Sequence, residues 1–224
     1  MSGPIEGSSS GFVPGVLGSN TVGIGVWGTS DSGNAVYGIS NTAAGVYGES
    51  SSGNAGEFHG KVVVTGNVAV TGNIVATGSV TADDVILSGS DCAEEFDVAN
   101  ASRLEPGTVV VVNSEGSIRE CGEPYNKRVA GVISGAGAYR PAVILGHDGS
   151  SGSKARVALM GRVYCKVDAS YAPIDIGDML TTSPTSGCAM KAADPSMAFG
   201  AVIGKALASV SDGRHLIPIL LALR

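Results

Sequence analysis

Three carboxylates stand close together in the sequence, and residues of this type could cleave a peptide bond. Asp91, Glu94 and Glu95 follow Gly89 within a few residues. Self-cleavage needs a polarised carbonyl and a general acid or base within hydrogen-bond reach. Crowded carboxylates raise one another's pKa, and Gly89 would give access to a strained bond near Ser88–Ser90. The segment therefore contains the residue types for autoproteolysis.

A simpler interpretation of these acids is structural, and it is the one we favour. On this interpretation the three carboxylates cap turns or pair with Arg103 and Lys127 at the surface. The four cysteines contain no C-x-x-C pair, so buried free thiols are expected, with disulfides or a metal as the alternatives. The G-x-G-x-x-G at Gly23–Gly28 belongs to a repeat and precedes no expected helix, so no dinucleotide site follows. We expect neither a cofactor nor a metal, because the histidines do not have the spacing of metal ligands. The histidines are His59, His147 and His215, and the cysteines are Cys92, Cys121, Cys165 and Cys188.

Composition excludes two broad classes of protein. The net charge is −6, and aromatic residues make up 5% of the 224-residue chain, which disfavours a nucleic-acid binder with a basic patch. The longest apolar run, Leu216–Leu223, is far shorter than the ~20 residues of a membrane helix.

The N-terminus has no basic start and no apolar core, so we expect synthesis in the cytoplasm without a signal peptide.

A ten-residue repeat occupies residues 15–60, after an expected N-terminal tail at 1–14. Gly25-Val26-Trp27-Gly28 recurs as Gly45-Val46-Tyr47-Gly48, and other copies lie between and beside them. Each unit reads as a short strand followed by a Ser/Asn/Thr/Gly turn. A unit this small cannot bury its apolar side chains alone, so neighbours must cover them. The expected core residues of the repeat are Leu17, Trp27, Tyr37, Tyr47 and Phe58.

A six-residue repeat fills residues 61–90. Its Val-x-Val-Thr-Gly-Asn units place alternate residues on one face of a strand, and each Thr-Gly-Asn step resets the direction. A single chain would leave this apolar row in water and its backbone groups unpaired, so we infer three chains in a homotrimeric β-helix or shaft. The alternatives are a single-chain β-solenoid and a disordered linker. The expected trimer core is Val62, Val64, Val68, Val70, Ile74, Ala76, Val80 and Ala82.

Residues 91–224 are predicted to form a compact β-sandwich or β-barrel, which makes the whole chain all-β. The predicted strands, which turn signals separate, are 108–112, 128–133, 141–145, 155–159, 162–167, 179–182, 199–203 and 217–223, and Asp194–Phe199 could make one helical turn. In the last strand both faces are apolar, which predicts a central strand or a subunit-interface strand. Pro218 favours a sheet edge there.

Two parts of the sequence resemble known families. The G-V-Y-G-x-S and V-T-G-N units over about residues 11–90 look like shafts of trimeric bacteriophage tail fibres and of contractile injection systems. The segment Ser90–Asp97, with Pro106–Val110 and Arg128–Ile133, is similar to self-cleaving chaperone domains of phage appendages. Cys92 departs from that pattern, where an aromatic residue is common.

Three functions remain open at this stage. The first is a homotrimeric fibre or spike that carries a C-terminal domain for surface attachment or capping; its partners would be a host glycan or protein receptor and a baseplate or particle protein. Candidate recognition loops are Gly146–Ser153 and Ser183–Gly187. The second is an autoproteolytic chaperone, and the third is a subunit of an extracellular filament. The expected location is a virion, a phage-like particle or an extracellular fibre.

Overall fold

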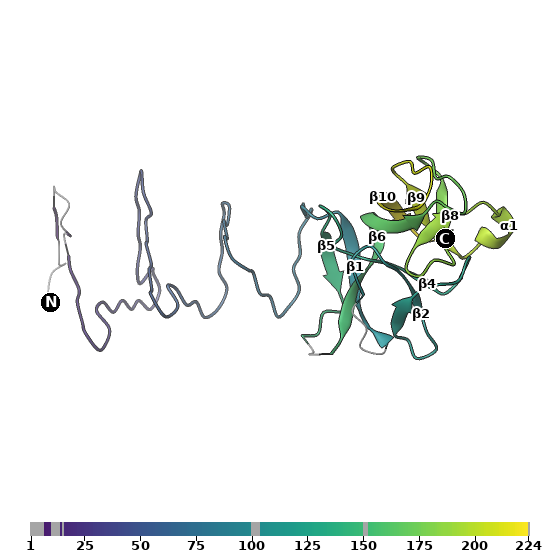
Figure 1. Cartoon of the computed structure of the whole chain (residues 1–224). Helices are drawn as coiled ribbons and strands as arrows, with labels where there is room; N and C mark the ends of the chain where they lie inside the picture. Colours follow the sequence, from purple (N-terminus) through teal and green to yellow (C-terminus); the bar gives the residue numbers. More distant parts are fainter. Residues whose placement is uncertain (1–6, 10–13, 15, 100–103, 150–151, 224) are drawn as a thin grey trace. The chain divides into compact units, whose positions relative to one another are not determined.

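The computed structural model describes residues 7–9, 14, 16–99, 104–149 and 152–223, and it divides the chain into two units between Gly78 and Ser79 (Figure 1). The division falls within the hexad repeats, and the first strand begins at Asp91. The expected tail at residues 1–14 lies mostly outside the described residues, as does Arg103.

The ten-residue repeat folds as a series of closed loops. Gly18 approaches Gly25, Gly28 approaches Ala35, and the same contact recurs at Gly38 with Gly45 and at Gly48 with Ala55. A polar side chain closes each turn: Ser30 Oγ accepts from Gly33 N–H at 3.0 Å, and Ser50 Oγ accepts from Gly53 N–H at 2.9 Å. Each ten-residue repeat of the sequence therefore forms one loop.

Close backbone approach explains the glycine that ends each unit. A Cβ on Gly48 would lie 2.6 Å from the carbonyl oxygen of Ala55, and a Cβ on Gly28 would lie 2.8 Å from that of Ala35. Both distances are shorter than real Cβ contacts, so any larger residue would push the two arms of the loop apart.

The predicted strands of the two repeats are absent from the single chain: described residues between 7 and 90 contain no strand or helix. The hexads bend at Thr65-Gly66, Thr71-Gly72 and Thr77-Gly78, where a change of direction was predicted. None of these three glycines has positive φ, so the change of direction does not use the left-handed conformation. A strand exists only as a member of a ladder, and the described part of this segment has no ladder partner.

The described residues of the second unit form ten strands and one short helix (Figure 1). The strands are β1 (Asp91–Asp97), β2 (Val109–Val112), β3 (Ile118–Glu120), β4 (Val129–Ile133), β5 (Pro141–Leu145), β6 (Lys154–Asp168), β7 (Met179–Thr182), β8 (Ala189–Lys191), β9 (Val202–Ala206) and β10 (Arg214–Ala222). The helix is α1 (Pro195–Ala198), which lies within the single turn predicted at Asp194–Phe199, and Asp194 caps its N-terminus.

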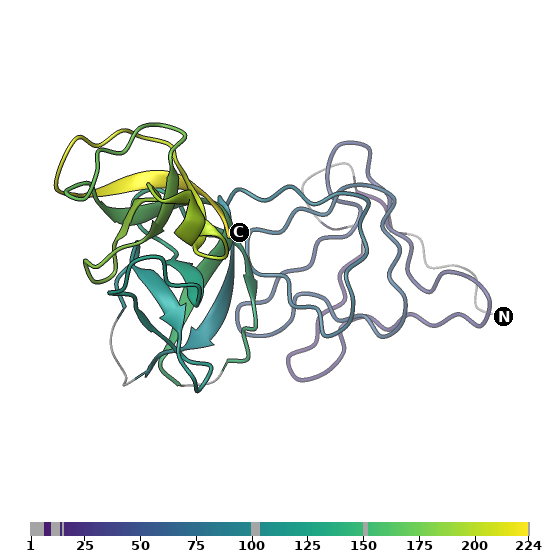
Figure 2. The ribbon, with the colours of Figure 1, turned by 90° about the vertical axis from the view of Figure 1, so that its right-hand side faces the viewer.

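Five of these strands close into a barrel, so the barrel half of the sandwich-or-barrel prediction is confirmed. The order β10-β9-β7-β8-β6 returns to its start because β10 also pairs with β6 along its whole length (Figure 2). Barrel strands expose one side to the interior, and Val163, Ile219 and Leu180 fill it with no exposed surface.

The other strands extend from the first half of β6. β1 lies between β5, to which it is parallel, and β6, to which it is antiparallel. β4 pairs with the opposite edge of β6, and β2 and β3 follow it. A smaller core of Val110, Ile118 and Val157 lies here. Strand β6 thus belongs to both halves of the unit, where two separate strands had been predicted.

Strand β10 is a central strand, which corrects the edge predicted from Pro218. Ile219–Leu221 pair with β9 on one side and with β6 on the other. β9 ends at Ala206. Pro218, which has no backbone N–H, therefore faces Leu207, the first residue after β9. There Leu207 N–H donates to the Pro218 carbonyl at 3.0 Å. Proline is tolerated because the reciprocal bond falls where the β9 ladder has already stopped.

Candidate functional site

The first strand after the repeats carries a buried carboxylate without partners. Asp91 is 3% exposed. Among the described residues, neither of its carboxylate oxygens has a hydrogen-bond partner, and neither has the buried Ser134 hydroxyl. Burial raises the pKa of the Asp91 carboxyl above its usual range, and the neighbouring Ser134 hydroxyl offsets part of the rise.

The peptide groups before Asp91 are held from two sides. Ser90 N–H donates to the Arg140 carbonyl at 2.8 Å, and the Ser90 carbonyl accepts from Arg162 N–H at 2.9 Å. Asp91 is in register with Gly161 of β6, and the register of β1 on β6 shifts just beyond, between Cys92 and Ala93. Gly161 has φ of +103°, and a Cβ there would lie 2.5 Å from the Ser90 carbonyl oxygen. The backbone at Ser90 is therefore fixed by hydrogen bonds on both sides and by close packing against Gly161.

Gly89 has a different role from the predicted one. A Cβ at this position would overlap the backbone of Ala142, and its φ is not in the left-handed region. Glycine is needed here for close packing against β5, and no backbone strain is visible at this residue.

The expected carboxylate cluster does not form. Glu95 lies four residues beyond Asp91 on an extended strand, about 13 Å along the chain. Its Oε2 lies 2.8 Å from His147 Nδ1, and its Oε1 accepts from Arg156 Nε at 3.2 Å. The contact with His147, aided by Arg156, lowers the pKa of the Glu95 carboxyl. Asp91 thus owes its raised pKa to burial and not to neighbouring acids.

The surface partners proposed for the acids are also different. Glu95 pairs with Arg156 and His147 instead of Lys127, while Arg103 lies outside the described residues. Glu94 packs beside Gly146. No sequence signal pointed to the ion pairs of Glu95, because its partners lie 52 and 61 residues away.

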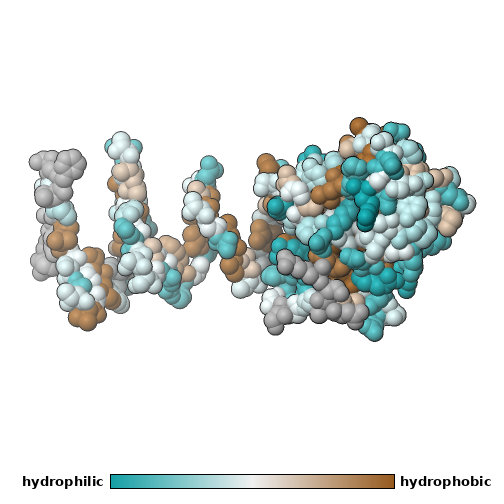
Figure 3. All heavy atoms as spheres, in the orientation of Figure 1, coloured by the Kyte–Doolittle hydropathy of each residue, from teal (hydrophilic) through white to brown (hydrophobic). Residues whose placement is uncertain are grey.

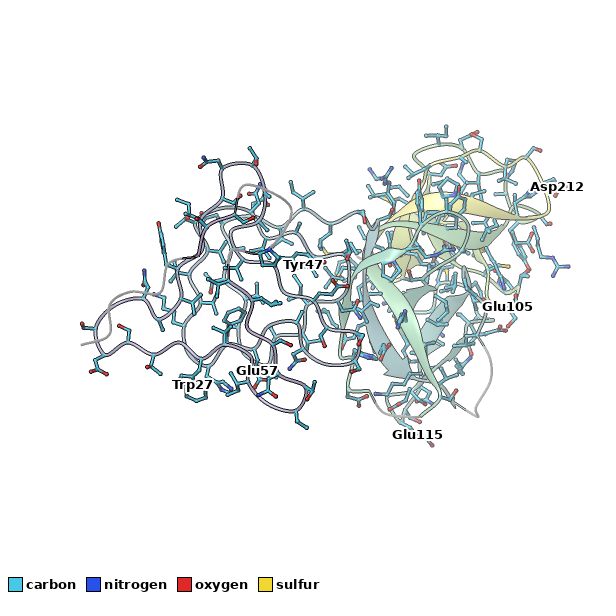
Figure 4. All side chains as sticks on the ribbon, turned by 90° about the vertical axis from the view of Figure 1, so that its left-hand side faces the viewer. Trp27, Tyr47, Glu57, Glu105, Glu115 and Asp212 are labelled. Carbon is cyan, nitrogen blue, oxygen red and sulfur yellow. The ribbon has the colours of Figure 1, made fainter. Side chains whose placement is uncertain are left out.

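The residues predicted to form the repeat and trimer cores are all exposed in the single chain. Trp27 is 73% exposed, and Leu17, Tyr37, Tyr47 and Phe58 are similarly open. In the hexads, exposure runs from 47% at Val70 to 77% at Ile74 and Val80, and Ala76 and Ala82 are exposed as well. Figure 3 shows hydrophobic residues recurring along this region, and Figure 4 shows Trp27 and Tyr47 among loops without strands.

The two candidate recognition loops are tied down in the structure. In the first, Lys154 Nζ lies 2.8 Å from Asp148, and His147 contacts Glu95. In the second, Ser183 is fully buried and Thr185 donates to Asp168 at 2.6 Å. Their described residues are anchored by their own side chains, which reduces the polar surface left for a ligand.

The remaining chemistry-bearing residues are dispersed. All four cysteines are free, and Cys121, Cys165 and Cys188 are buried, as predicted for free thiols. Within the described part of the chain, no three His, Cys, Asp or Glu residues are placed to share a metal ion. The described helix is far too short to cross a bilayer.

Comparison with known proteins gives a coarse likeness to phage proteins. No family model and no curated protein matches the chain. The pre-mature gene product 12 of bacteriophage phi29 is similar over 65% of this chain and 23% of its own, with 14% identity and a TM-score of 0.48. The C-terminal fragment of that product gives 14% identity and a TM-score of 0.41 over 58% of this chain and 99% of the fragment.

A third solved structure is the N base of the phi29 head fibre gp8.5. Its identity is 16% and its TM-score 0.27, over 59% of this chain and 90% of that one. The chain spans under a quarter of the length of the pre-mature gene product 12. Because the TM-scores of these three structures are below 0.5, any functional conclusion must come from the residues of this chain.

Proposed function

We propose that the chain is a structural fibre or spike subunit that assembles as a homotrimer through its repeats. The single observation that supports this is the row of large apolar side chains that one chain leaves exposed, from Leu17 to Val80. Soluble monomers rarely expose contiguous apolar surface on this scale. Three parallel copies would cover each other's rows and supply the missing ladder partners.

The C-terminal unit would then be carried at the end of the shaft. Its closed barrel has an independent core, which suits a rigid domain for attachment or capping. A surface glycan or protein would be its external partner, and a baseplate or particle protein its internal one. Three copies at one tip would add avidity to weak single contacts. The particle or extracellular fibre is the location that fits this role.

The test is the mass in solution of the full chain and of two matched variants. Light scattering should give three chains of 22.2 kDa for the native protein. Val70→Asp, in the inferred row, should reduce the mass because each assembly would bury three unpaired charges. Val75→Asp, on the opposite face and 88% exposed, should leave the mass unchanged.

Three results would contradict the proposal. A folded monomer would overturn it directly. Equal loss of mass in Val70→Asp and Val75→Asp would show that assembly does not depend on the predicted apolar face of the hexads. A mass far above three chains would instead identify an open filament. Trp27, the single tryptophan, gives a second readout, since its emission should shift to longer wavelength when the copies separate.

Autoproteolysis is a second candidate, and two observations beside Ser90 support it. The Ser90 carbonyl accepts from Arg162 N–H at 2.9 Å, which polarises it, and the buried carboxyl of the next residue, Asp91, would serve as the general acid. Water would add to the Ser90 carbonyl carbon, the bond to the Asp91 nitrogen would break, and that nitrogen would take up a proton.

A denaturing gel tests this second candidate. Cleavage beside Ser90 would replace the 22.2 kDa band with bands of about 9 and about 13 kDa, and Asp91→Asn should abolish the products if Asp91 donates the proton. Asp97→Asn, at the exposed end of β1, is the control. A single full-length band in the native protein would exclude cleavage at this bond.

A further inference from the structure

The outer side of β10 carries an apolar surface that nothing in the described chain covers. Leu220 is 43% exposed, and Met160 on the neighbouring strand β6 is 60% exposed. They line one hollow together with Ala222 and Leu223. We call these four residues the β10 face.

The β10 face continues across the barrel strands. Leu220 and Ala222 also line a second hollow, on the β9 side, with Met179 and Gly204. These two residues therefore form a ridge between two hollows. Lys205, at the β9 margin, is the single charged residue among those lining either hollow. An apolar patch with a charged residue at its rim has the composition typical of the centre of a protein–protein interface.

The β10 face adjoins the point where the repeats enter the unit. Met160 is in register with Cys92, and Gly161 with Asp91, the first residue of β1. On the other edge of β6, Gly161 is in register with Leu221 and Arg162 with Leu220. The β10 face is thus one strand away from the junction strand.

Covalent connection limits how far this face can lie from its sister copies. This step rests on the proposed function, in which residues up to Ala82 belong to a trimeric shaft. The seven residues from Ala82 to Gly89 span at most about 25 Å when fully extended. Three copies of the junction, and of the face beside it, must therefore stay close to one axis. Tethering at such distances gives effective concentrations in the millimolar range.

From this juxtaposition we infer that the β10 face is a second subunit interface, on which the C-terminal unit packs against the other two copies of the same chain. The occupant is a second copy because the tether brings that copy, at high local concentration, to the side of the unit where the apolar surface lies. The ridge of one copy would enter a hollow of the next, which is the heterologous contact that closes a threefold ring. The nearby charge of Arg162 does not oppose this contact, since its guanidinium lies over the Tyr139 ring at 5.3 Å.

Methionine oxidation on the native full-length protein tests the inference. Met160 is more exposed in the single chain than Met197, at 60% against 46%, so an uncovered Met160 should oxidise at least as fast. If the β10 face is an interface, peroxide should oxidise Met160 at least fivefold more slowly than Met197 in the assembled protein. Met179, beside the second hollow, should also be protected.

A matched pair of variants adds a second readout. Leu220→Asp would place a charge on the ridge and should bring the Met160 oxidation rate up to that of Met197. Ile176→Asp, an exposed position that lines neither hollow, should leave Met160 protected. The native comparison of the two methionines does not depend on either variant folding.

The outcomes separate this inference from the function on which it rests. A trimer with Met160 as reactive as Met197 overturns the β10 interface and leaves the shaft proposal intact. A monomer overturns both. A trimer with Met160 protected in the native protein and in Ile176→Asp, and exposed in Leu220→Asp, supports both.

Discussion

The Glu95 carboxylate and the His147 imidazole meet at 2.8 Å, which ties strand β1 to the loop after β5. Arg156 contacts the same carboxylate from β6. The Glu95 carboxylate therefore links three segments of the C-terminal unit: β1, the loop after β5, and β6. The Glu95 side chain is 10% exposed.

Glu95→Gln should lower the melting temperature at pH 7. The folded protein holds the pKa of this carboxyl below its ordinary 4.5, so the ionised form stabilises the fold above that pH. The stabilisation disappears as the pH falls through the lowered value. Thermal melts of Glu95→Gln and native protein should therefore converge below pH 4.5. Glu94→Gln is the control on the same strand, and an effect of equal size there would contradict the assignment.

Asp91→Asn should have the opposite sign. Burial raises the pKa of Asp91 above 3.8, so this residue stabilises the fold fully below 3.8, and that contribution is lost as the pH rises through the raised value. At pH 7 the neutral amide should stabilise the unit by about 1 kcal/mol, or about 2–4 °C. The gain should vanish in acid. Thermal melts at fixed protein concentration check this prediction. An Asp91→Asn variant that is less stable than the native protein at pH 7 would contradict it, because the carboxylate would then have a stabilising partner.

Gly48→Ala should open one loop of the ten-residue repeat. The added Cβ would lie 2.6 Å from the Ala55 carbonyl oxygen, whereas the nearest atom to a Cβ on Gly53 is Ser50 Oγ at 3.4 Å. Gly48→Ala should make residues 48–55 sensitive to limited proteolysis, and Gly53→Ala, in the same loop, should leave them as resistant as in the native protein. Equal sensitivity in both variants would exclude close approach as the reason for Gly48.

Thiol reactivity should separate the cysteines. Cys92 is partly exposed, whereas Cys121 and Cys165 have no exposed surface. Burial raises the pKa of the Cys165 thiol strongly and also raises that of Cys188, so little thiolate is available there. A thiol reagent should modify Cys92 first in the native protein and all four residues after unfolding. Rapid native labelling of Cys165 would contradict the barrel core.

Much of the C-terminal fold is predictable because its strands alternate apolar residues between clear turn signals. Pro141–Leu145 and Met179–Thr182 were predicted with their observed bounds. The short strands β3 and β8 were not predicted, since three residues are too few for a period to appear. The predicted strand at 199–203 begins instead at Val202, because the turn that follows α1, with Gly200 at positive φ, takes its first residues.

The junction was harder to predict, because its chemistry depends on distant partners. Sequence proximity suggested that Asp91 and Glu95 interact, yet the strand between them holds them apart. Ser134 and Arg156 reach the site only through the pairing of β4 and β1 with β6. The repeats show the opposite case: their period of ten is plain in the sequence, and what covers them lies outside the single chain.

Strand β1 is bonded along both edges, to β5 and to β6, and this has a mechanical consequence. A load that arrives through the chain at Ser90 cannot peel β1 from one neighbour alone. It must disrupt two ladders together, and the longer one continues through β6 into the barrel. In the proposed fibre, tension on the repeats would therefore be carried into β6, which pairs with four strands: β1, β4, β8 and β10.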